Sequence, residues 1–143
     1  MEHFALFNAK RAEGFTCPGG TSFAPNPEPL AFDCRLWRAS QLHSQDMADN
    51  NYFSHISQDG RTPGQRASAQ GAPYGGENIA AGNADPQAVL NQWLESNGHC
   101  MNMGNPSYKI AAVGYGYTSE TVYRHYWTQM FASSAIAADT TSC

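Results

Sequence analysis

The four cysteines constrain the fold of this chain more than any other feature. They are Cys17, Cys34, Cys100 and Cys143, which lie far apart, and no C-x-x-C pair occurs. Zinc fingers and thioredoxin-like redox sites need closely spaced pairs, so this spacing argues against both. Separated cysteines are typical of two disulfides in an exported protein, and a bridge at Cys143 would hold a segment that otherwise frays. Spacing alone leaves three pairings open.

Length and charge favour one globular domain over residues 1–143, with one core. The net charge is -4 and no Lys/Arg cluster occurs, so we expect no nucleic-acid partner. No apolar run is long enough to span a bilayer, so we expect no integral membrane segment. The first residues, "MEHFALFNAKRAEG", read as an amphipathic helix and not as a signal peptide, which suits a mature exported form or a cytosolic protein.

Helical patterns come first in the chain and strand patterns come last. The spacing predicts helices over 2–13, from Asp33 to Asn50-Asn51, from Thr62-Pro63 to Gly71, and from Asp85-Pro86 to Asn97-Gly98. Residues 15–32 are rich in Pro and Gly and predict an irregular connection. Alternation over 109–117 and 122–132 predicts an antiparallel hairpin. This segregated order predicts an α+β fold with helices packed on an antiparallel sheet.

Three polar residues in loop-like stretches are the candidates for chemistry. His55 and His99 stand beside Gly, Ser or Asn, and Glu77 lies in "GGEN", where a carboxylate can face a cleft but needs a partner. Glu95 precedes His99 by four residues, which would place both on one face of a continuous helix, although Asn97-Gly98 argues for a break.

Two imidazoles and one or two carboxylates form the ligand set of Zn²⁺ or another divalent cation. The same set suits general acid–base work, and scattered surface polar residues are the alternative. We expect Cys100 to form a bridge and not to act as a nucleophile. We interpret the remaining histidines as surface or packing residues (His3 and His125) and as a buried core residue (His43).

Four ordered blocks resemble the CAP superfamily (SCP/TAPS) in its bacterial-type secreted form. They are "HSQDMADNNYFSHISQDGRTPGQR", "GENIAAG", "VLNQWLESNGHCMN" and "VGYGY…YWTQMFA". The resemblance implies an α-β-α sandwich, with a central antiparallel sheet between helical layers and an open cleft on one face. It implies that His55 ("FSH"), Glu77 ("GEN") and His99 ("S-x-G-H") line this cavity, with Glu95 as a looser match. Asn97 stands where the family usually has proline.

The resemblance also implies the covalent framework and the setting of the protein. It suggests Cys17–Cys100 as one bridge and Cys34–Cys143 as the other. It implies a secreted, extracellular or periplasmic protein, which we expect to be a monomer.

Three functions are compatible with the resemblance. The first is a binding module without established catalysis, whose cleft holds a divalent cation, through His55, His99 and Glu77, and a small-molecule or protein ligand. The second is a sterol or lipid carrier, in which aromatic residues line an apolar groove; packing is the alternative role for these residues. The third is a metal-dependent hydrolase with Glu77 as general base, although no H-E-x-x-H motif occurs. The aromatic candidates are Tyr52, Phe53, Tyr74, Tyr115 and Tyr117.

Overall fold

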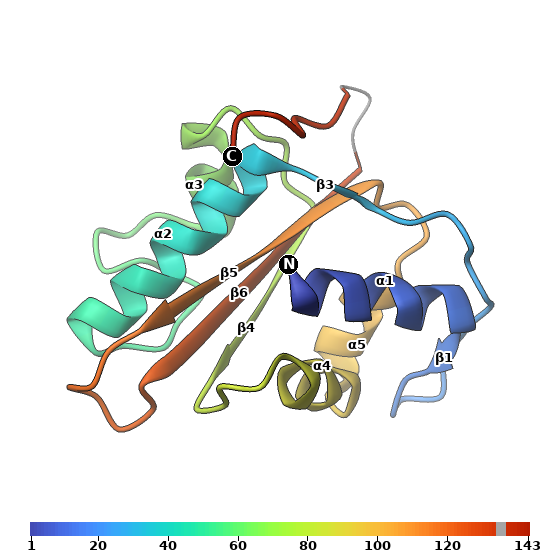
Figure 1. Cartoon of the computed structure of the whole chain (residues 1–143), viewed down its shortest axis with the longest axis horizontal. Helices are drawn as coiled ribbons and strands as arrows, with labels where there is room; N and C mark the ends of the chain where they lie inside the picture. The colour runs from blue at the N-terminus through green and yellow to red at the C-terminus, as the bar shows by residue number, and fades with distance from the viewer. Residues whose placement is uncertain (134–136) are drawn as a thin grey trace.

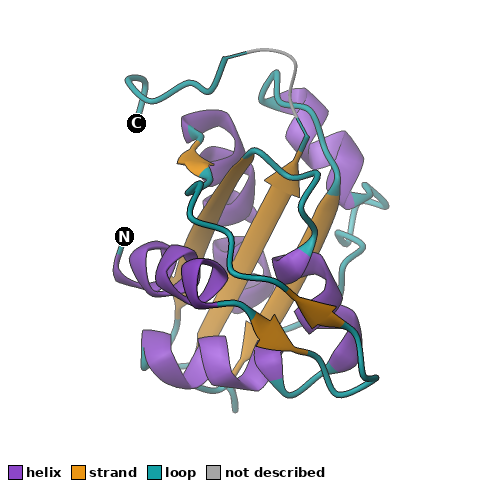
Figure 2. Ribbon diagram, turned by 90° about the vertical axis from the view of Figure 1, so that its right-hand side faces the viewer, coloured by secondary structure: helices purple, strands orange, loops and turns teal. Residues whose placement is uncertain are grey.

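The computed structural model describes residues 1–133 and 137–143 and has three layers (Figures 1 and 2). The elements are α1 (Glu2–Glu13), β1 (Phe15–Thr16), β2 (Ser22–Phe23), β3 (Ala31–Phe32), α2 (Cys34–Asn50), α3 (Pro63–Ala69), β4 (Gly76–Ala81), α4 (Pro86–Leu94), α5 (Asn97–Gly104), β5 (Ile110–Tyr117) and β6 (His125–Ala132). A four-stranded sheet, in the order β3-β5-β6-β4, is the middle layer. Helices α2 and α3 cover one face, and α1, α4 and α5 lie against the other.

The three long strands of the sheet pair antiparallel. Strand β5 pairs with β6 from Ile110↔Ala132 to Tyr117↔His125, and β4 pairs with the other side of β6. Short β3 joins β5 in parallel, so the sheet carries one parallel edge pair that the sequence does not predict. The predicted α-β-α sandwich is confirmed.

Side-chain caps define where three of the helices begin. Asp33 accepts hydrogen bonds from the backbone at the start of α2, and Asp85 does the same for α4. Thr62 and Gln65 form a reciprocal capping box at α3. These are the helix starts that the sequence predicts, because capping depends on residues only two or three positions apart.

The strands depart more from the sequence expectation than the helices do. Residues 15–32, expected to be irregular, contain three two-residue strands, and 76–81 forms β4 although the sequence assigns no element there. The last strand begins at His125 and not at 122. Arg124 has a φ of 65°, a left-handed conformation that interrupts an extended chain just before β6.

Two glycines allow α2 to lie directly on β5. A Cβ atom at Gly114 would stand 2.4 Å from the backbone nitrogen of Gln41, and one at Gly116 would stand 2.5 Å from the carbonyl oxygen of Ser44. No side chain larger than hydrogen fits at either position without moving the helix. The small residues of "VGYGY" therefore set the distance between the helix and the sheet.

Glutamines of α2 cover the outer edge of β5 beyond the short β3. The amide of Gln41 donates to the carbonyl oxygen of Tyr115 at 2.6 Å, and its oxygen accepts from the Tyr115 nitrogen at 2.9 Å. Gln45 donates to the Tyr117 carbonyl oxygen at 3.3 Å. These side chains take the hydrogen-bonding positions that a neighbouring strand would fill.

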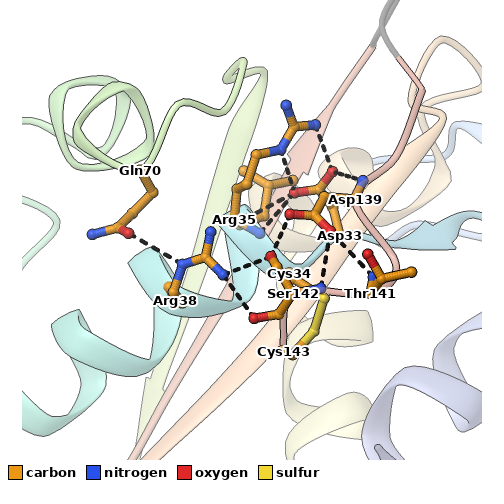
Figure 3. The surroundings of a disulfide bond; sticks show 10 residues. Asp33, Cys34, Arg35, Arg38, Gln70, Asp139, Thr141, Ser142 and Cys143 are labelled. Atoms are coloured by element: carbon orange, nitrogen blue, oxygen red, sulfur yellow. Dashed lines mark hydrogen bonds and ion pairs between the residues drawn. A yellow bond between two sulfur atoms is a disulfide. The ribbon is translucent and has the colours of Figure 1, made fainter.

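Two disulfides tie distant parts of the chain together. Cys17–Cys100 joins the β1–β2 region to α5, and Cys34–Cys143 joins the start of α2 to the last residue. They are the two pairs that the family resemblance implies. Around the second bridge, Asp33 accepts a hydrogen bond from the Asp139 backbone nitrogen, so the C-terminal segment also docks through hydrogen bonds (Figure 3).

His3 lies in the core between the sheet and α4, although its sequence position allows a surface role. Its side chain is 2% exposed and packs edge-on against Trp93, with ring centroids 5.0 Å apart. Neither ring nitrogen has a hydrogen-bond partner among the described residues. Burial, reinforced by the N-terminal charge, lowers the pKa of His3 from 6.5 to about 4.

We expect His3 to make the fold sensitive to acid. The folded state resists protonation of the buried imidazole. The stability that neutral His3 contributes is therefore fully present above pH 6.5 and is lost as pH falls from 6.5 to about 4. The loss in unfolding free energy is about 3 kcal/mol. Urea unfolding of the native protein and of His3→Phe at pH 7 and pH 4 measures it. An equal pH dependence in both proteins would exclude His3 as the cause.

Candidate functional site

Glu77 is the buried centre of the candidate site. It lies on β4 opposite Met130 of β6, and its side chain is fully buried. One carboxylate oxygen, Oε1, lies 2.8 Å from the Nδ1 atom of His55. The other, Oε2, accepts a hydrogen bond of 2.7 Å from Arg66. Both oxygens of this carboxylate therefore have close partners.

His55 stands in the loop between α2 and α3, with half of its side chain exposed. Because the Glu77 carboxylate accepts the proton on Nδ1, the Nε2 atom of a neutral His55 carries the free lone pair. Two partners hold the loop: Arg66 donates to the His55 carbonyl oxygen at 2.8 Å, and His43 contacts the Ser54 carbonyl oxygen at 2.8 Å. A buried acid behind an imidazole is the arrangement that orients histidine ligands in metal sites.

Arg66 is the residue of this site that the sequence analysis missed. It lies on α3, is 4% exposed, and also donates to the Ser57 hydroxyl at 2.9 Å. One guanidinium therefore joins Glu77 to the loop that carries His55. The signal that could have found it is the buried acid itself, since a buried carboxylate requires a cationic or multiple hydrogen-bonding partner.

His99 reaches the site from α5, on the far side of β4. Asn78 of β4 donates to the His99 carbonyl oxygen at 3.1 Å, and Asn102 donates to the Asn78 side chain at 2.9 Å. The next residue, Cys100, forms the bridge to Cys17. Burial lowers the pKa of His99 below its ordinary 6.5, and the charge of His55 lowers it further. The imidazole is therefore neutral at pH 7 and can accept a hydrogen bond or bind a cation.

The two imidazoles share one surface cleft of about 550 Å³ along β4. Its walls combine the two histidines with polar side chains and three apolar ones. The lining residues are Phe53, Ser54, His55, Ile56, Ile79, Gln92 and His99. Glu77 lies behind His55 and not in the cleft wall, because its side chain is fully buried. Of the four predicted cavity residues, His55, Glu77 and His99 are brought together.

Glu95 is not brought into this group. Helix α4 ends at Leu94, and α5 begins at Asn97 after Ser96 adopts an extended conformation. The helix therefore ends before Asn97-Gly98, where the sequence predicts its end, and Gly98 lies inside α5. Because no continuous helix joins Glu95 to His99, the i, i+4 relation does not apply, and Glu95 is exposed.

The aromatic candidates for a lipid groove are dispersed over the molecule. Phe53 belongs to the cleft and packs against Tyr123, with ring centroids 6.3 Å apart. Tyr52 packs against His43 on the side of α2. Tyr115 stacks with His125 on β5 and β6 and contributes to another pocket. These rings do not line one common groove.

The described side chains of this cleft offer a cation two imidazole donors at most. Within residues 1–133 and 137–143, no three or more His, Cys, Asp or Glu side chains are grouped so as to hold a metal ion. Glu77 is engaged by Arg66 and His55, which leaves the free nitrogens of His55 and His99 as protein donors. Water or a ligand would supply the remaining coordination positions.

Comparison with known proteins identifies a family and two sequence relatives. Residues 6–131 match the sequence model of the Cysteine-rich secretory protein family, CAP. The uncharacterized protein YkwD of Bacillus subtilis (strain 168) is 37% identical over 106 residues, covering 73% of this chain and 39% of YkwD. The uncharacterized membrane protein YlbC of that strain is 37% identical over 91 residues, 62% of this chain and 24% of YlbC. The chain thus spans well under half the length of these relatives.

Solved structures agree with the sequence relatives. An extracellular SCP-domain protein from Bacillus anthracis has a TM-score of 0.68 at 32% identity, over 91% of this chain and 39% of that one. An outer surface protein from Borrelia burgdorferi also has a TM-score of 0.68, at 18% identity, over 91% of both chains. The second likeness concerns the fold alone. Across the described ranges, this chain has no helix long and apolar enough to cross a bilayer.

Proposed function

The chain belongs to the Cysteine-rich secretory protein (CAP) family, and from this premise we propose that it is an exported binding module whose cleft holds a divalent cation together with a ligand. The observation that carries the proposal is the convergence of His55 and His99 on one cleft, with Glu77 fully buried behind His55. Two disulfides and the extracellular SCP-domain relative from Bacillus anthracis support export.

From these hydrogen bonds we infer different roles for His55, His99 and Glu77. His55 and His99 present nitrogen donors to the cleft, whereas Glu77 holds the ring of His55 and keeps its Nδ1 protonated. Arg66 in turn neutralises Glu77, so the cleft receives little of its negative charge. A bound cation would supply a Lewis-acidic centre with open positions, and Ser54 and Gln92, which line the same cleft, would offer polar contacts to a ligand there.

Zinc titration of the metal-free protein tests the proposal. We expect binding heat and thermal stabilisation in the native protein, with about 2.7 kcal/mol of stabilisation when free Zn²⁺ is 100-fold above its dissociation constant. His55→Ala combined with His99→Ala removes both nitrogen donors and should abolish the heat and the stabilisation.

Glu95→Gln is the matched control for this titration. It changes a nearby acidic residue that the structure leaves exposed outside the cleft, so zinc should bind it as it binds the native protein. An absence of heat and stabilisation in the native protein would reject the cation site. Unchanged zinc affinity in the double-histidine variant would place the ion elsewhere.

A further inference from the structure

Glu77 and Asn78 are consecutive residues of β4, the strand at the margin of the sheet beside the candidate cleft. Successive side chains of a strand point to opposite faces of its sheet. Glu77 contacts His55 in the loop after α2 and Arg66 on α3. Asn78 contacts α5, which lies against the other face. The two histidines of the cleft therefore come from opposite helical layers, and neighbouring residues of one strand reach both.

Asn78 is fully buried and joins α5 to the sheet through both its nitrogen and its oxygen. The nitrogen donates to the carbonyl oxygen of His99 and to the side-chain oxygen of Gln129, each at 3.1 Å. The oxygen accepts a hydrogen bond of 2.9 Å from Asn102, which also donates to the carbonyl oxygen of Glu77 at 3.3 Å. These hydrogen bonds hold the backbone of α5 against β4 at the position of His99.

The ring of His99 has no hydrogen-bond support comparable to that of His55. Glu77 lies 2.8 Å from Nδ1 of His55, whereas Nδ1 of His99 is buried and has no partner among the described residues. The His99 ring lies beside Trp93 instead, with ring centroids 6.5 Å apart. Because Nδ1 of His99 is buried, Nε2 is the nitrogen that can face the cleft. The direction of Nε2 therefore depends on where the backbone of α5 lies.

From these contacts we propose that Asn78 is the positioning residue for His99, as Glu77 is for His55, so that two consecutive residues set the separation of the two donors. This inference rests on the proposed cation site and adds the means by which β4 holds both donors. Asn78 acts through the carbonyl oxygen of His99 and does not touch the cation. Partners that orient metal ligands typically contribute about 10- to 100-fold to metal affinity. We expect the lower end of that range, because Asn78 holds the backbone of His99 and not its ring.

Zinc calorimetry of Asn78→Ala tests this assignment. We expect the dissociation constant for Zn²⁺ to rise about tenfold, because α5 loses its hydrogen bond to β4 at His99. Asn102→Ala removes the donor to the Asn78 oxygen but keeps the bond to His99, so it should raise the constant by a smaller factor. If Asn78→Ala fails to fold, Asn102→Ala decides, and an unchanged zinc affinity in that variant would reject the assignment.

Thr128→Val is the matched control for the loss of a buried hydrogen bond from this sheet. Thr128 is fully buried on β6, opposite Ile79 of β4, and its hydroxyl lies 2.7 Å from that of Ser44 on α2. This bond holds α2 and neither histidine. The substitution should therefore lower the urea concentration at the unfolding midpoint and leave zinc affinity unchanged.

Imidazole signals in carbon–proton NMR spectra of the metal-free protein give a readout that needs no zinc. The ring current of Trp93 shifts the signals of nearby protons, so the His99 signals report the position of its ring. With all spectra recorded at one fixed, slightly alkaline pH, Asn78→Ala should move the His99 signals more than those of His55. Thr128→Val should move neither set.

The two readouts separate failure of this inference from failure of the cation site. Native zinc affinity in folded Asn78→Ala would overturn the inference, and an equal loss of affinity in Thr128→Val would show general loosening of the fold instead. If the native protein binds no zinc, the cation site is rejected and the spectra decide alone. His99 signals that stay in place in Asn78→Ala would then show that Asn78 does not position this ring.

Discussion

Replacing Arg66 with methionine is expected to lower the free energy of unfolding by about 3–5 kcal/mol, because it leaves a buried carboxylate without its cation. Arg66 and Glu77 have side chains that are 4% and 0% exposed, so water cannot replace the lost partner. The substitution also removes hydrogen bonds to the His55 carbonyl oxygen and the Ser57 hydroxyl. Urea unfolding with intact disulfides measures the change.

A double-mutant cycle separates this ion pair from simple loss of packing. Glu77→Met alone leaves Arg66 buried without its anion, and should also destabilise the protein. The double variant removes both charges, so it should be clearly more stable than the sum of the single changes indicates. Strict additivity of the two substitutions, or a cost below about 1 kcal/mol for Arg66→Met, would contradict the pairing.

Removing the Cys17–Cys100 bridge by alanine substitution at both positions should cost about 4 kcal/mol of stability and should also weaken the proposed zinc binding. The bridge spans 83 residues, and the entropy gained by the unfolded chain accounts for most of the loss in the loop-closure description. Zinc binding weakens because Cys100 adjoins His99, and the bridge holds α5 at its place beside β4. Guanidinium unfolding and zinc calorimetry give the two effects.

The second disulfide provides the matched control. Cys34–Cys143 spans 109 residues, so alanine substitution at both positions should destabilise the protein by a similar amount. This bridge lies at the start of α2, away from the cleft, and its loss should leave zinc affinity unchanged in the folded variant. If both cysteine pairs reduce zinc affinity equally, then the bridge does not position His99.

The parts of the fold that depend on near neighbours could be predicted from the sequence. Asp33, Thr62 and Asp85 mark helix starts correctly because each cap acts over two or three residues. Strand β4 could not be predicted in the same way. Its pairing partner is β6, about 50 positions later in the chain, and the glycine-flanked run at 76–81 lacks a clear local strand pattern.

The candidate site also contains residues that the local sequence could identify and residues that it could not. His55, Glu77 and His99 could be selected because polar residues in short, glycine-rich or serine-rich stretches have little reason to lie there for packing alone. Arg66 could not, since its role depends on α3 packing beneath the loop, which brings it to residues eleven positions away on either side. Glu95 was selected from helical spacing and as a looser match to the family, and Ser96 interrupts the helix on which the spacing argument depends.

The glutamine pair on α2 has a consequence for assembly. An uncovered strand margin would allow a second molecule to add its own strand, and repetition of that contact would produce open-ended polymers. Gln41 occupies both backbone groups of Tyr115, so this part of the β5 margin is closed by the molecule's own side chain. At high protein concentration, the domain would thereby resist fibre growth along this margin without needing an additional strand.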